Sequence, residues 1–243
     1  PMEQLMRLWA GFHDGFPPRD NDYDLPFSNV NGSHVLPAVG IGMGINYTNT
    51  ANCVVVNYGD GASSQGAVNE ALNFAAVYKA PVVFVCENNG WAISTPVHQQ
   101  ASKSIFAVRG AAFDIPSIRV DGNDIFAMIH ATKQAVERAK SGEGPSLIEA
   151  VTYRMSLHTT ADDPTVYRAD SEVEKWKQRC PLLRFEIYLK NKNVLQQSGI
   201  DRIKEECDKE VLQARDNFYD MDSANPSKLF DHLYAVSYTH LTL

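Results

Sequence analysis

The sequence predicts an α/β fold, in which a doubly wound, mostly parallel sheet has helices on both faces and a helical C-terminal extension follows. Two observations carry this prediction. Short apolar runs typical of buried strands alternate with helical segments up to residue 151, and such a βαβα order is typical of a parallel sheet. After Asp170 the chain becomes helical and charged, which indicates a solvent-facing or subunit-facing cover.

The elements can be placed in order along the chain. Residues 1–16 are expected to be the end of a helix, and residues 17–31, rich in Pro, Asp and Asn, a loop. Residues 32–46 carry four glycines among apolar residues, which predicts a helix packed closely against a neighbour. The following strands and helices are expected at 53–58 (strand), 66–79 (helix), 81–86 (strand), 117–120 (strand), from Ile125 (helix) and 146–151 (strand).

The apolar patterns of three helices predict how each is buried. Residues 66–79 are apolar on nearly every face, so this helix is expected to be central. The helix from Ile125 has a stripe at helical spacing, formed by Ile125, Met128, Ile129, Thr132, Val136 and Ala139. A stripe on the last helix predicts that it covers another surface, and it consists of Ile203, Cys207, Val211, Ala214 and Phe218.

Two segments between these elements are expected to be long loops. Residues 90–116 show neither a helical nor a strand period. A loop of that length is usually functional or bound to a partner. Residues 153–166 form a second loop, directly after the last strand.

Composition and charge exclude several classes of protein. The chain has 243 residues, of which 44% are hydrophobic and 21% charged, as in ordinary globular domains. Its net charge of −7 argues against non-specific binding to nucleic acid or to an anionic membrane surface. No apolar run approaches membrane-spanning length. The four cysteines are widely spaced without a CxxC pair, so free thiols are expected.

The chain is expected to divide into three segments. Residues 1–168 form the α/β domain, and residues 169–236 form a helical segment of the same unit. Residues 237–243 show no capping or periodic pattern and resemble a translated sequencing adapter, so we expect a non-native tail. The chain opens at Pro1 already in helical pattern, so we expect that a longer N-terminus precedes it.

The most informative feature is a pair of motifs that follow two apolar runs. A Gly-Asp-Gly turn at 59–61 follows the run 54–56, and an Asn-Asn pair at 88–89 follows the run 82–85. Open α/β sheets bind ligands at the carboxyl ends of their strands. An acid and an amide placed there can share one hard cation, and glycines let backbone amides approach phosphate. The alternative is two ordinary turns, because Asn and Gly both accept positive φ.

Several segments in order resemble one family. The motifs at 59–66, 70–75 and 86–96 are similar to those in the alpha subunit of thiamine-diphosphate-dependent 2-oxo acid dehydrogenases, which include the pyruvate and branched-chain enzymes. The resemblance covers about residues 1–234 and continues through 118–124, 142–149 and 153–168. It implies the thiamine diphosphate-binding fold, with thiamine diphosphate and Mg²⁺ as cofactors.

The resemblance implies a magnesium site at the paired motifs. Asp60, the side chain of Asn89 and the backbone carbonyl of Trp91 would coordinate the ion. The family often has tyrosine where Trp91 stands, and a backbone ligand tolerates that change. Hard oxygen ligands shared with phosphate and water are what Mg²⁺ prefers.

The same resemblance implies contacts to both ends of the cofactor. In the turn that Gly59 opens, Gly61 and Ala62 would give backbone amides to the diphosphate, at a helix start where the dipole favours anions. The backbone around Asn29 and Asn31 would face the aminopyrimidine ring. The family usually has an apolar residue where Asn31 stands.

His158 is the candidate catalytic residue. It lies in the loop after the last strand, between Arg154 and Asp162, and a cation and carboxylates nearby can set its protonation near neutral pH. A solvated loop histidine is the alternative. The resemblance assigns the matching histidine to cofactor binding and acyl transfer, and it assigns bracing of the loop to Arg154 and Asp162.

Four other residues are weaker candidates. His34 and Ser94 could each approach the substrate, although a polar turn is an equal or better explanation of both. Arg109 is expected to have a surface role. Thr159 stands where animal relatives carry a phosphorylatable serine, and a threonine there does not predict regulation.

The resemblance implies a reaction and partners. The reaction is oxidative decarboxylation of a 2-oxo acid with reductive acylation of a lipoyl group on a transacylase partner. Segments 64–66 and 79–81 favour pyruvate over branched-chain substrates. The family assembles as an α2β2 heterotetramer, with the cofactor between alpha and beta subunits. A bacterial source would place the chain in the cytoplasm, and the mitochondrial matrix is the alternative.

Two other functions stay open at this point. One is another thiamine enzyme, such as a transketolase-like or acetoin-cleaving enzyme. The other is a non-catalytic subunit that only scaffolds a beta partner. A cofactor-binding assay with and without beta would separate these functions.

Overall fold

The computed structural model describes residues 2–12 and 30–222. The chain forms two compact units, of which the larger is Ser28–Val194. The smaller combines Pro1–Phe27 with Leu195–Leu243. None of the helices in the described part of the chain combines the length and apolar character that a membrane span requires.

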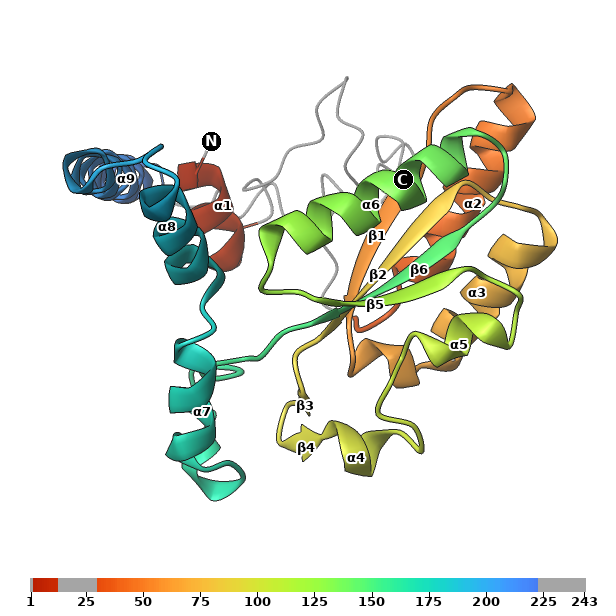
Figure 1. Cartoon of the computed structure of the whole chain (residues 1–243), viewed down its shortest axis with the longest axis horizontal. Coiled ribbons are helices and arrows are strands. Elements are labelled where there is room, and N and C mark those ends of the chain that lie inside the picture. Colours follow the sequence, from red (N-terminus) through yellow and green to blue (C-terminus); the bar gives the residue numbers. More distant parts are fainter. Residues whose placement is uncertain (1, 13–29, 223–243) are drawn as a thin grey trace, which may run out of the picture. The chain divides into compact units, whose positions relative to one another are not determined.

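The larger unit is built on a four-stranded parallel sheet (Figure 1). Its strands lie in the order β1-β2-β6-β5, so the second strand pairs with the fourth. The strands are β1 (Val54–Gly59), β2 (Val82–Asn88), β5 (Ser117–Asp121) and β6 (Ser146–Val151). These bounds confirm the predicted strands, except that β2 runs two residues further and brings Asn88 into the sheet.

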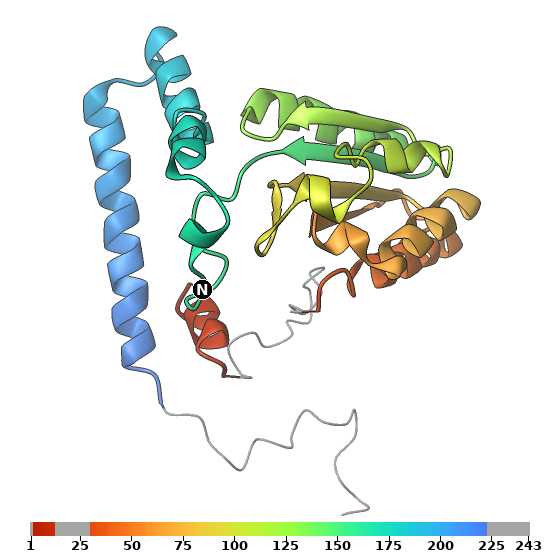
Figure 2. The same ribbon diagram turned by 90° about the horizontal axis from the view of Figure 1, so that it is seen from below.

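Helices cover both faces of this sheet, as the sequence predicts (Figure 2). On one face lie α2 (Val35–Thr48) and α3 (Gly66–Val77), and on the other α6 (Ile125–Lys140). Because α3 and α6 lie on opposite faces, the winding reverses between β2 and β6. In open α/β sheets such a reversal creates a crevice at the carboxyl ends of the strands.

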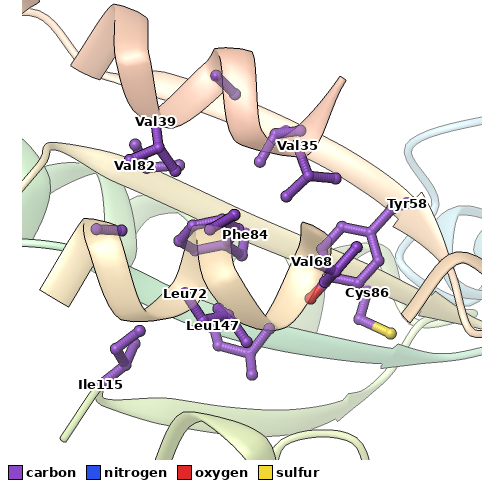
Figure 3. Close-up of a cluster of buried hydrophobic side chains, with 14 of the residues drawn as sticks. Val35, Val39, Tyr58, Val68, Leu72, Val82, Phe84, Cys86, Ile115 and Leu147 are labelled. Atoms are coloured by element: carbon purple, nitrogen blue, oxygen red, sulfur yellow. The ribbon is translucent and has the colours of Figure 1, made fainter. Parts of the chain in front are cut away.

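The main core lies between the sheet and the pair α2 and α3. Figure 3 shows side chains from these helices and from the strands meeting there. The close approach predicted for the glycine-rich segment is confirmed at Gly42, where an added Cβ would lie 2.8 Å from Val82 Cγ2 and 3.2 Å from Ala80 Cβ. The Asn46 side chain ties the end of α2 to the carbonyls of Tyr78 and Lys79.

Two helices are buried differently from the prediction. In α3, Phe74 and Val77 are exposed, so the expectation of a helix covered on nearly every face is wrong for the chain by itself. In α6, Ile125 and Ile129 are also exposed. The buried positions of α6 are mostly alanines, namely Ala131, Ala135 and Ala139. Small side chains let this helix lie close to the sheet. Ala139 belongs to the predicted stripe, whereas a pattern that weights large apolar residues misses Ala131 and Ala135.

Residues 90–116 contain short elements where a long loop is predicted. A two-stranded hairpin, β3 (Trp91–Ala92) with β4 (Thr95–Pro96), leads into α4 (Val97–Gln100). A second short helix, α5 (Val108–Ala111), follows, and Phe106 before it is fully buried. Elements of two to four residues are too short to produce a period in the sequence.

The segment after β6 contains a 3-10 turn, η3 (Pro164–Val166), and the helices α7 (Asp170–Lys177) and α8 (Pro181–Asn191). Trp176 of α7 stacks on Tyr153, with ring centroids 5.2 Å apart. Arg184 of α8 pairs with Asp121 at 2.9 Å and with Asp124 at 3.3 Å. These contacts fix α7 and α8 to the sheet unit.

The smaller unit pairs α1 (Met2–Trp9) with the long α9 (Gln197–Tyr219). Ile200 and Ala214 are the buried residues of α9. Ile203, Cys207 and Val211 are exposed, so the predicted stripe covers less than expected.

Candidate functional site

The loops after three adjacent strands meet at one edge of the sheet. Asp60 follows β1, and its Oδ1 accepts a hydrogen bond of 3.1 Å from the backbone amide of Asn89, which follows β2. The loop after β6 joins them, because the Arg154 amide donates to the Asn89 carbonyl at 3.2 Å. The parallel register of the strands thus brings the two predicted motifs together.

Asp60 is the most unusual side chain at this edge. It is fully buried, and Oδ2 has no hydrogen-bond partner among the described residues. Burial raises the pKa of the Asp60 carboxyl, although the amide of Asn89 and the charge of Arg154 oppose the shift. A buried carboxylate oxygen without a partner is costly, and a bound cation would remove that cost.

Asn89 and Trp91 are the two other predicted ligands. Asn89 Oδ1 accepts from the Trp91 amide at 3.1 Å, and an amide oxygen has a second lone pair. Trp91 lies opposite Pro96 in the hairpin, and proline has no backbone N–H to donate to the Trp91 carbonyl. Within residues 2–12 and 30–222 no cluster of three His, Cys, Asp or Glu side chains could hold a metal ion. A cation at Asp60 would therefore need amide and backbone oxygens.

The turn after Asp60 is shaped to present backbone amides. It contains the short 3-10 helix η2 (Ala62–Ser64) and leads into α3. The internal bonds of the turn use the amides of Ser63, Ser64 and Gln65, so those of Gly61 and Ala62 are not needed to close it. A Cβ on Gly61 would lie 3.1 Å from Ala92 Cβ, so glycine also makes room for the hairpin.

The segment between the hairpin and β5 clamps this turn from outside. The Arg109 guanidinium donates to the Ser63 carbonyl and lies over the Phe106 ring, 4.9 Å from its centroid. Gln100 Nε2 donates to the Asp60 carbonyl. The expected surface role of Arg109 is therefore wrong. A lone arginine in a segment without a period gives no sequence signal for such a contact.

Of the two residues predicted to face the aminopyrimidine, Asn31 lies in the turn before α2. Asn29 is outside the described residues, and Asn31 is exposed. Gly32, with φ of 78°, lies so close to α3 that an added Cβ would be 3.2 Å from Val68 Cγ2 and 3.4 Å from the Ala62 carbonyl oxygen. Asn31 is thus held next to the turn of Gly61 and Ala62.

His34 and Ser94 show no contact that favours a substrate role. His34 Nε2 lies 2.7 Å from the Asn57 carbonyl on β1, which is a structural contact at the end of the turn. Ser94 is exposed at the tip of the hairpin. Beside it, Ile93 has φ of 55°, a left-handed conformation that β-branched side chains rarely adopt.

The His158 loop is exposed and held by side chains. The His158 amide donates to Asp162 Oδ2 at 2.8 Å, and its ring Nδ1 lies 3.4 Å from Arg154 Nη1. Arg154 reaches Asp162 through Tyr167, whose hydroxyl accepts from Nη2 at 2.8 Å and donates to Oδ2 at 2.7 Å. Arg154 Nη2 also donates to the Ile93 carbonyl at 2.6 Å. The brace joins Arg154 and Asp162, as predicted, but through a tyrosine that sequence reasoning missed.

The negative charge of Asp162 in this brace is stabilised by hydrogen-bond donors and by the positive charge of Arg154. The His158 amide is the largest influence on the Asp162 carboxyl and lowers its pKa, and the Tyr167 hydroxyl and Arg154 lower it further. The Tyr167 ring also lies against Trp91, with centroids 5.2 Å apart. The loop that carries His158 is therefore tied to the hairpin that carries Trp91.

Comparison with known proteins identifies the family. Residues 25–227 match the sequence model of the family described as "Dehydrogenase E1 component". The chain is 39% identical over 239 residues to the pyruvate dehydrogenase E1 component subunit alpha of Acholeplasma laidlawii, which is 96% of this chain and 68% of that protein. It is 40% identical over 210 residues to the 3-methyl-2-oxobutanoate dehydrogenase subunit alpha of Mycobacterium tuberculosis, 86% of this chain and 57% of that one.

A third relative gives the same picture. Over 205 residues the chain is 39% identical to the pyruvate dehydrogenase E1 component subunit alpha of Staphylococcus aureus, which is 84% of this chain and 55% of the relative. The chain thus spans little more than half the length of two of these three relatives. Both the family match and the identities cover most of this chain, and it belongs to the dehydrogenase E1 component family.

Proposed function

We propose that this chain is the alpha part of a thiamine-diphosphate- and magnesium-dependent 2-oxo acid dehydrogenase. One observation carries the proposal. The buried Oδ2 of Asp60 lacks a partner, beside the turn of Gly61 and Ala62 and beside Asn89. Membership of the dehydrogenase E1 family supports thiamine diphosphate as the cofactor.

In this proposal three residues hold the magnesium ion. Asp60 supplies a carboxylate oxygen, Asn89 its amide oxygen and Trp91 its backbone carbonyl. Because Asp60 is the one charged group of this set, it would cancel half of the charge of a bound Mg²⁺, and the remaining charge would be available to attract a diphosphate. The fit rests on the chemistry of the donors: all three are hard oxygens on loops that the sheet brings together.

The turn that opens at Gly59 is proposed to hold the diphosphate. Gly61 and Ala62 donate their backbone amides, and the following helix start favours an anion. Asn31, and Asn29 before it, would contact the opposite end of the cofactor. When bound, thiamine diphosphate supplies the electron sink that decarboxylation of a 2-oxo acid requires.

His158 is proposed to act at the acyl transfer step. Its ring is exposed, so a large partner such as a lipoyl-bearing domain can approach it. Arg154, as a pure donor, requires Nδ1 to be the acceptor. This contact favours the tautomer that carries its proton on Nε2, the nitrogen that can be presented to an incoming group.

Partners and substrate are proposals as well. We infer a beta subunit in an α2β2 assembly, a lipoyl-bearing transacylase and a small 2-oxo acid. The relatives' names cover both pyruvate and 3-methyl-2-oxobutanoate, so pyruvate stays a preference from the sequence segments 64–66 and 79–81. Bacterial cytoplasm stays the predicted location.

The test is reconstitution of the full-length chain with a beta subunit. Release of carbon dioxide and acylation of a lipoyl domain are measured with pyruvate and with 3-methyl-2-oxobutanoate. The proposal expects both products to require thiamine diphosphate and Mg²⁺, with the higher kcat/KM for pyruvate. A folded complex that binds cofactor but does not acylate the lipoyl domain would favour another thiamine enzyme. A complex that binds no cofactor would favour the scaffold function.

A further inference from the structure

Glu149 is a fully buried carboxylate for which the proposed function has no use. It lies in the middle of β6 and is fully buried. The parallel register places it opposite Cys86 of β2 and Arg119 of β5. Its only charged partner in the described part of the chain is Arg119, whose Nε is 3.2 Å away and whose side chain is 46% exposed.

The two oxygens of this carboxylate accept from different segments. Oε1 accepts from Asn88 Nδ2 at 2.8 Å, as well as from Arg119. Oε2 accepts from the backbone amide of Ala107 at 2.9 Å. One carboxylate therefore connects the end of β2 with the segment that begins α5.

The Asn88 contact fixes the loop that carries Asn89. Because Nδ2 of Asn88 donates to Glu149, its Oδ1 faces the other way and accepts from the Gly90 amide at 3.3 Å. This closes the turn around Asn89, whose own amide points at Asp60 Oδ1. The orientation of the Asn88 amide thus sets the position of Asn89.

The Ala107 contact fixes the segment that covers the turn of Asp60. Arg109, two residues further on, donates to the Ser63 carbonyl. Gln100 of the same segment donates to the Asp60 carbonyl. Glu149 thus contacts both the loop of Asn89, through Asn88, and the segment that holds the Asp60 turn, through Ala107.

We propose that Glu149 is a positioning residue for the magnesium site, acting through Asn88 on Asn89 and through Ala107 on the clamp of Asp60. This proposal rests on the proposed function. A buried ion pair is weak evidence for stability, since an apolar pair of the same volume often does as well. A carboxylate here has a different value: only an acceptor with two oxygens can receive donors from both segments at once.

The test uses the full-length chain in complex with its beta subunit. Magnesium affinity is measured by calorimetry at saturating thiamine diphosphate for wild type, Glu149→Gln, Asn88→Ala and the double variant. Glutamine keeps the size of Glu149 but has one acceptor oxygen, so one segment would face its NH₂ group. We expect each single variant to weaken magnesium affinity about 10-fold or more, as supporting contacts of metal ligands do.

The double variant separates positioning from general weakening. If Glu149 acts through Asn88, the double variant should bind magnesium within about 2-fold of the Glu149→Gln single, whereas independent effects would multiply. Glu143→Gln is the matched control, because Glu143 is an exposed carboxylate before the other end of β6. It should leave magnesium affinity unchanged. Multiplying losses while the Ala107 amide keeps its wild-type hydrogen exchange, or a folded Glu149→Gln complex with wild-type affinity, would overturn the proposal.

A second measurement decides the proposal without any ligand. Hydrogen exchange of the amides of Asn89 and Ala107 is followed in the same proteins. The amide on the side that faces the glutamine NH₂ group should exchange faster in Glu149→Gln than in Glu143→Gln, and equal rates at both amides would overturn the positioning role. If wild type itself binds no magnesium, the proposed function fails, and the exchange rates still test the role of Glu149 in the two loops.

Discussion

The turn at Asp60 and the loop at His158 both follow strands of one parallel sheet, but different forces hold them. Asp60 is buried, and its neighbours are fixed by backbone bonds between β1, β2 and β6. His158 is exposed, and its loop is fixed by the side chains of Arg154, Tyr167 and Asp162. The difference suggests a division of labour. Backbone contacts of the sheet hold Asp60 and Asn89, which are the proposed metal ligands, and a side-chain brace holds the His158 loop, which is proposed to meet a partner.

The largest expected effect is at the buried region. Asp60→Asn removes the only carboxylate among the proposed ligands, so we expect the magnesium-dependent affinity for thiamine diphosphate to fall about 100-fold or more. Calorimetry on the full-length complex measures this loss. Wild-type affinity in Asp60→Asn would show that the cation lies elsewhere.

The same substitution should not weaken the cation-free protein. Burial raises the pKa of Asp60, so the stability that its protonated form contributes is lost as the pH rises through this raised pKa. At neutral pH the raised pKa therefore costs stability, and asparagine, which does not ionise, removes that cost. Thermal unfolding without cation should give a Tm for Asp60→Asn at least as high as for wild type. A Tm below that of wild type would contradict the claim that the buried Asp60 carboxyl destabilises the protein when no cation is bound.

The second effect is at the exposed region. Arg154→Met removes the bonds to Tyr167, to the Ile93 carbonyl and to His158. We expect lipoyl acylation to slow by about 10- to 100-fold, because a misplaced catalytic group can cost this much, while magnesium affinity changes little. Arg179→Met is the matched control, since Arg179 is an exposed arginine that pairs with Asp121 instead. Equal losses in the two variants would argue against a specific brace.

The third effect concerns the packing of α2 against the sheet that carries both regions. Gly42→Ala would place Cβ 2.8 Å from Val82 Cγ2, so we expect a loss of about 1–3 kcal/mol of unfolding free energy. Gly44→Ala, in the same helix with no atom near the added Cβ, should instead gain up to about 1 kcal/mol. Denaturant unfolding compares the two. A Gly44→Ala as destabilised as Gly42→Ala would show that contact with the sheet is not the cause of the loss at Gly42.

The smallest effect is a pH dependence of the His158 loop. The pKa of Asp162 is lowered, first by the His158 amide. A lowered carboxyl pKa gives stability that is present above the unfolded pKa and lost as the pH falls through the folded one. The loop should therefore stay ordered at neutral pH and loosen only below about pH 4.

A nuclear magnetic resonance titration of the His158 amide resonance would show this loosening. Asp162→Asn should remove the transition, and Asp163→Asn, which alters the neighbouring carboxyl that binds Thr165, should keep it. A transition retained in Asp162→Asn would place its cause elsewhere.

The sequence predicts the buried region better than the exposed one, for a physical reason. Val54 to Val56 and the run 82–85 are continuous apolar strands, and parallel pairing of such strands brings Asp60 and Asn89 together. Recognising the two strands and their parallel pairing is therefore enough to predict that Asp60 and Asn89 are neighbours. The turns at Gly61 and at the Asn-Asn pair could also be predicted, because glycine and asparagine are the residues that turns favour.

The other contacts depend on side chains that come from distant segments. Tyr167 lies 13 residues from Arg154, and Arg109 lies 46 residues from Ser63. Neither pair forms a local pattern, so the part that Tyr167 plays in the brace and the clamp by Arg109 could not be predicted from the sequence. Two buried positions of α6 were missed for another reason, since Ala131 and Ala135 carry little weight in an apolar pattern although they are buried in the core on this face of the sheet.

The most direct test of this division is a crossed measurement on one reconstituted complex. Magnesium-dependent affinity for thiamine diphosphate and the rate of lipoyl acylation are both measured for Asp60→Asn and for His158→Ala. We predict that Asp60→Asn loses cofactor binding, whereas His158→Ala binds cofactor near wild-type affinity but acylates slowly. A His158→Ala complex that acylates at the normal rate, or an Asp60→Asn complex that binds cofactor normally, would contradict the account.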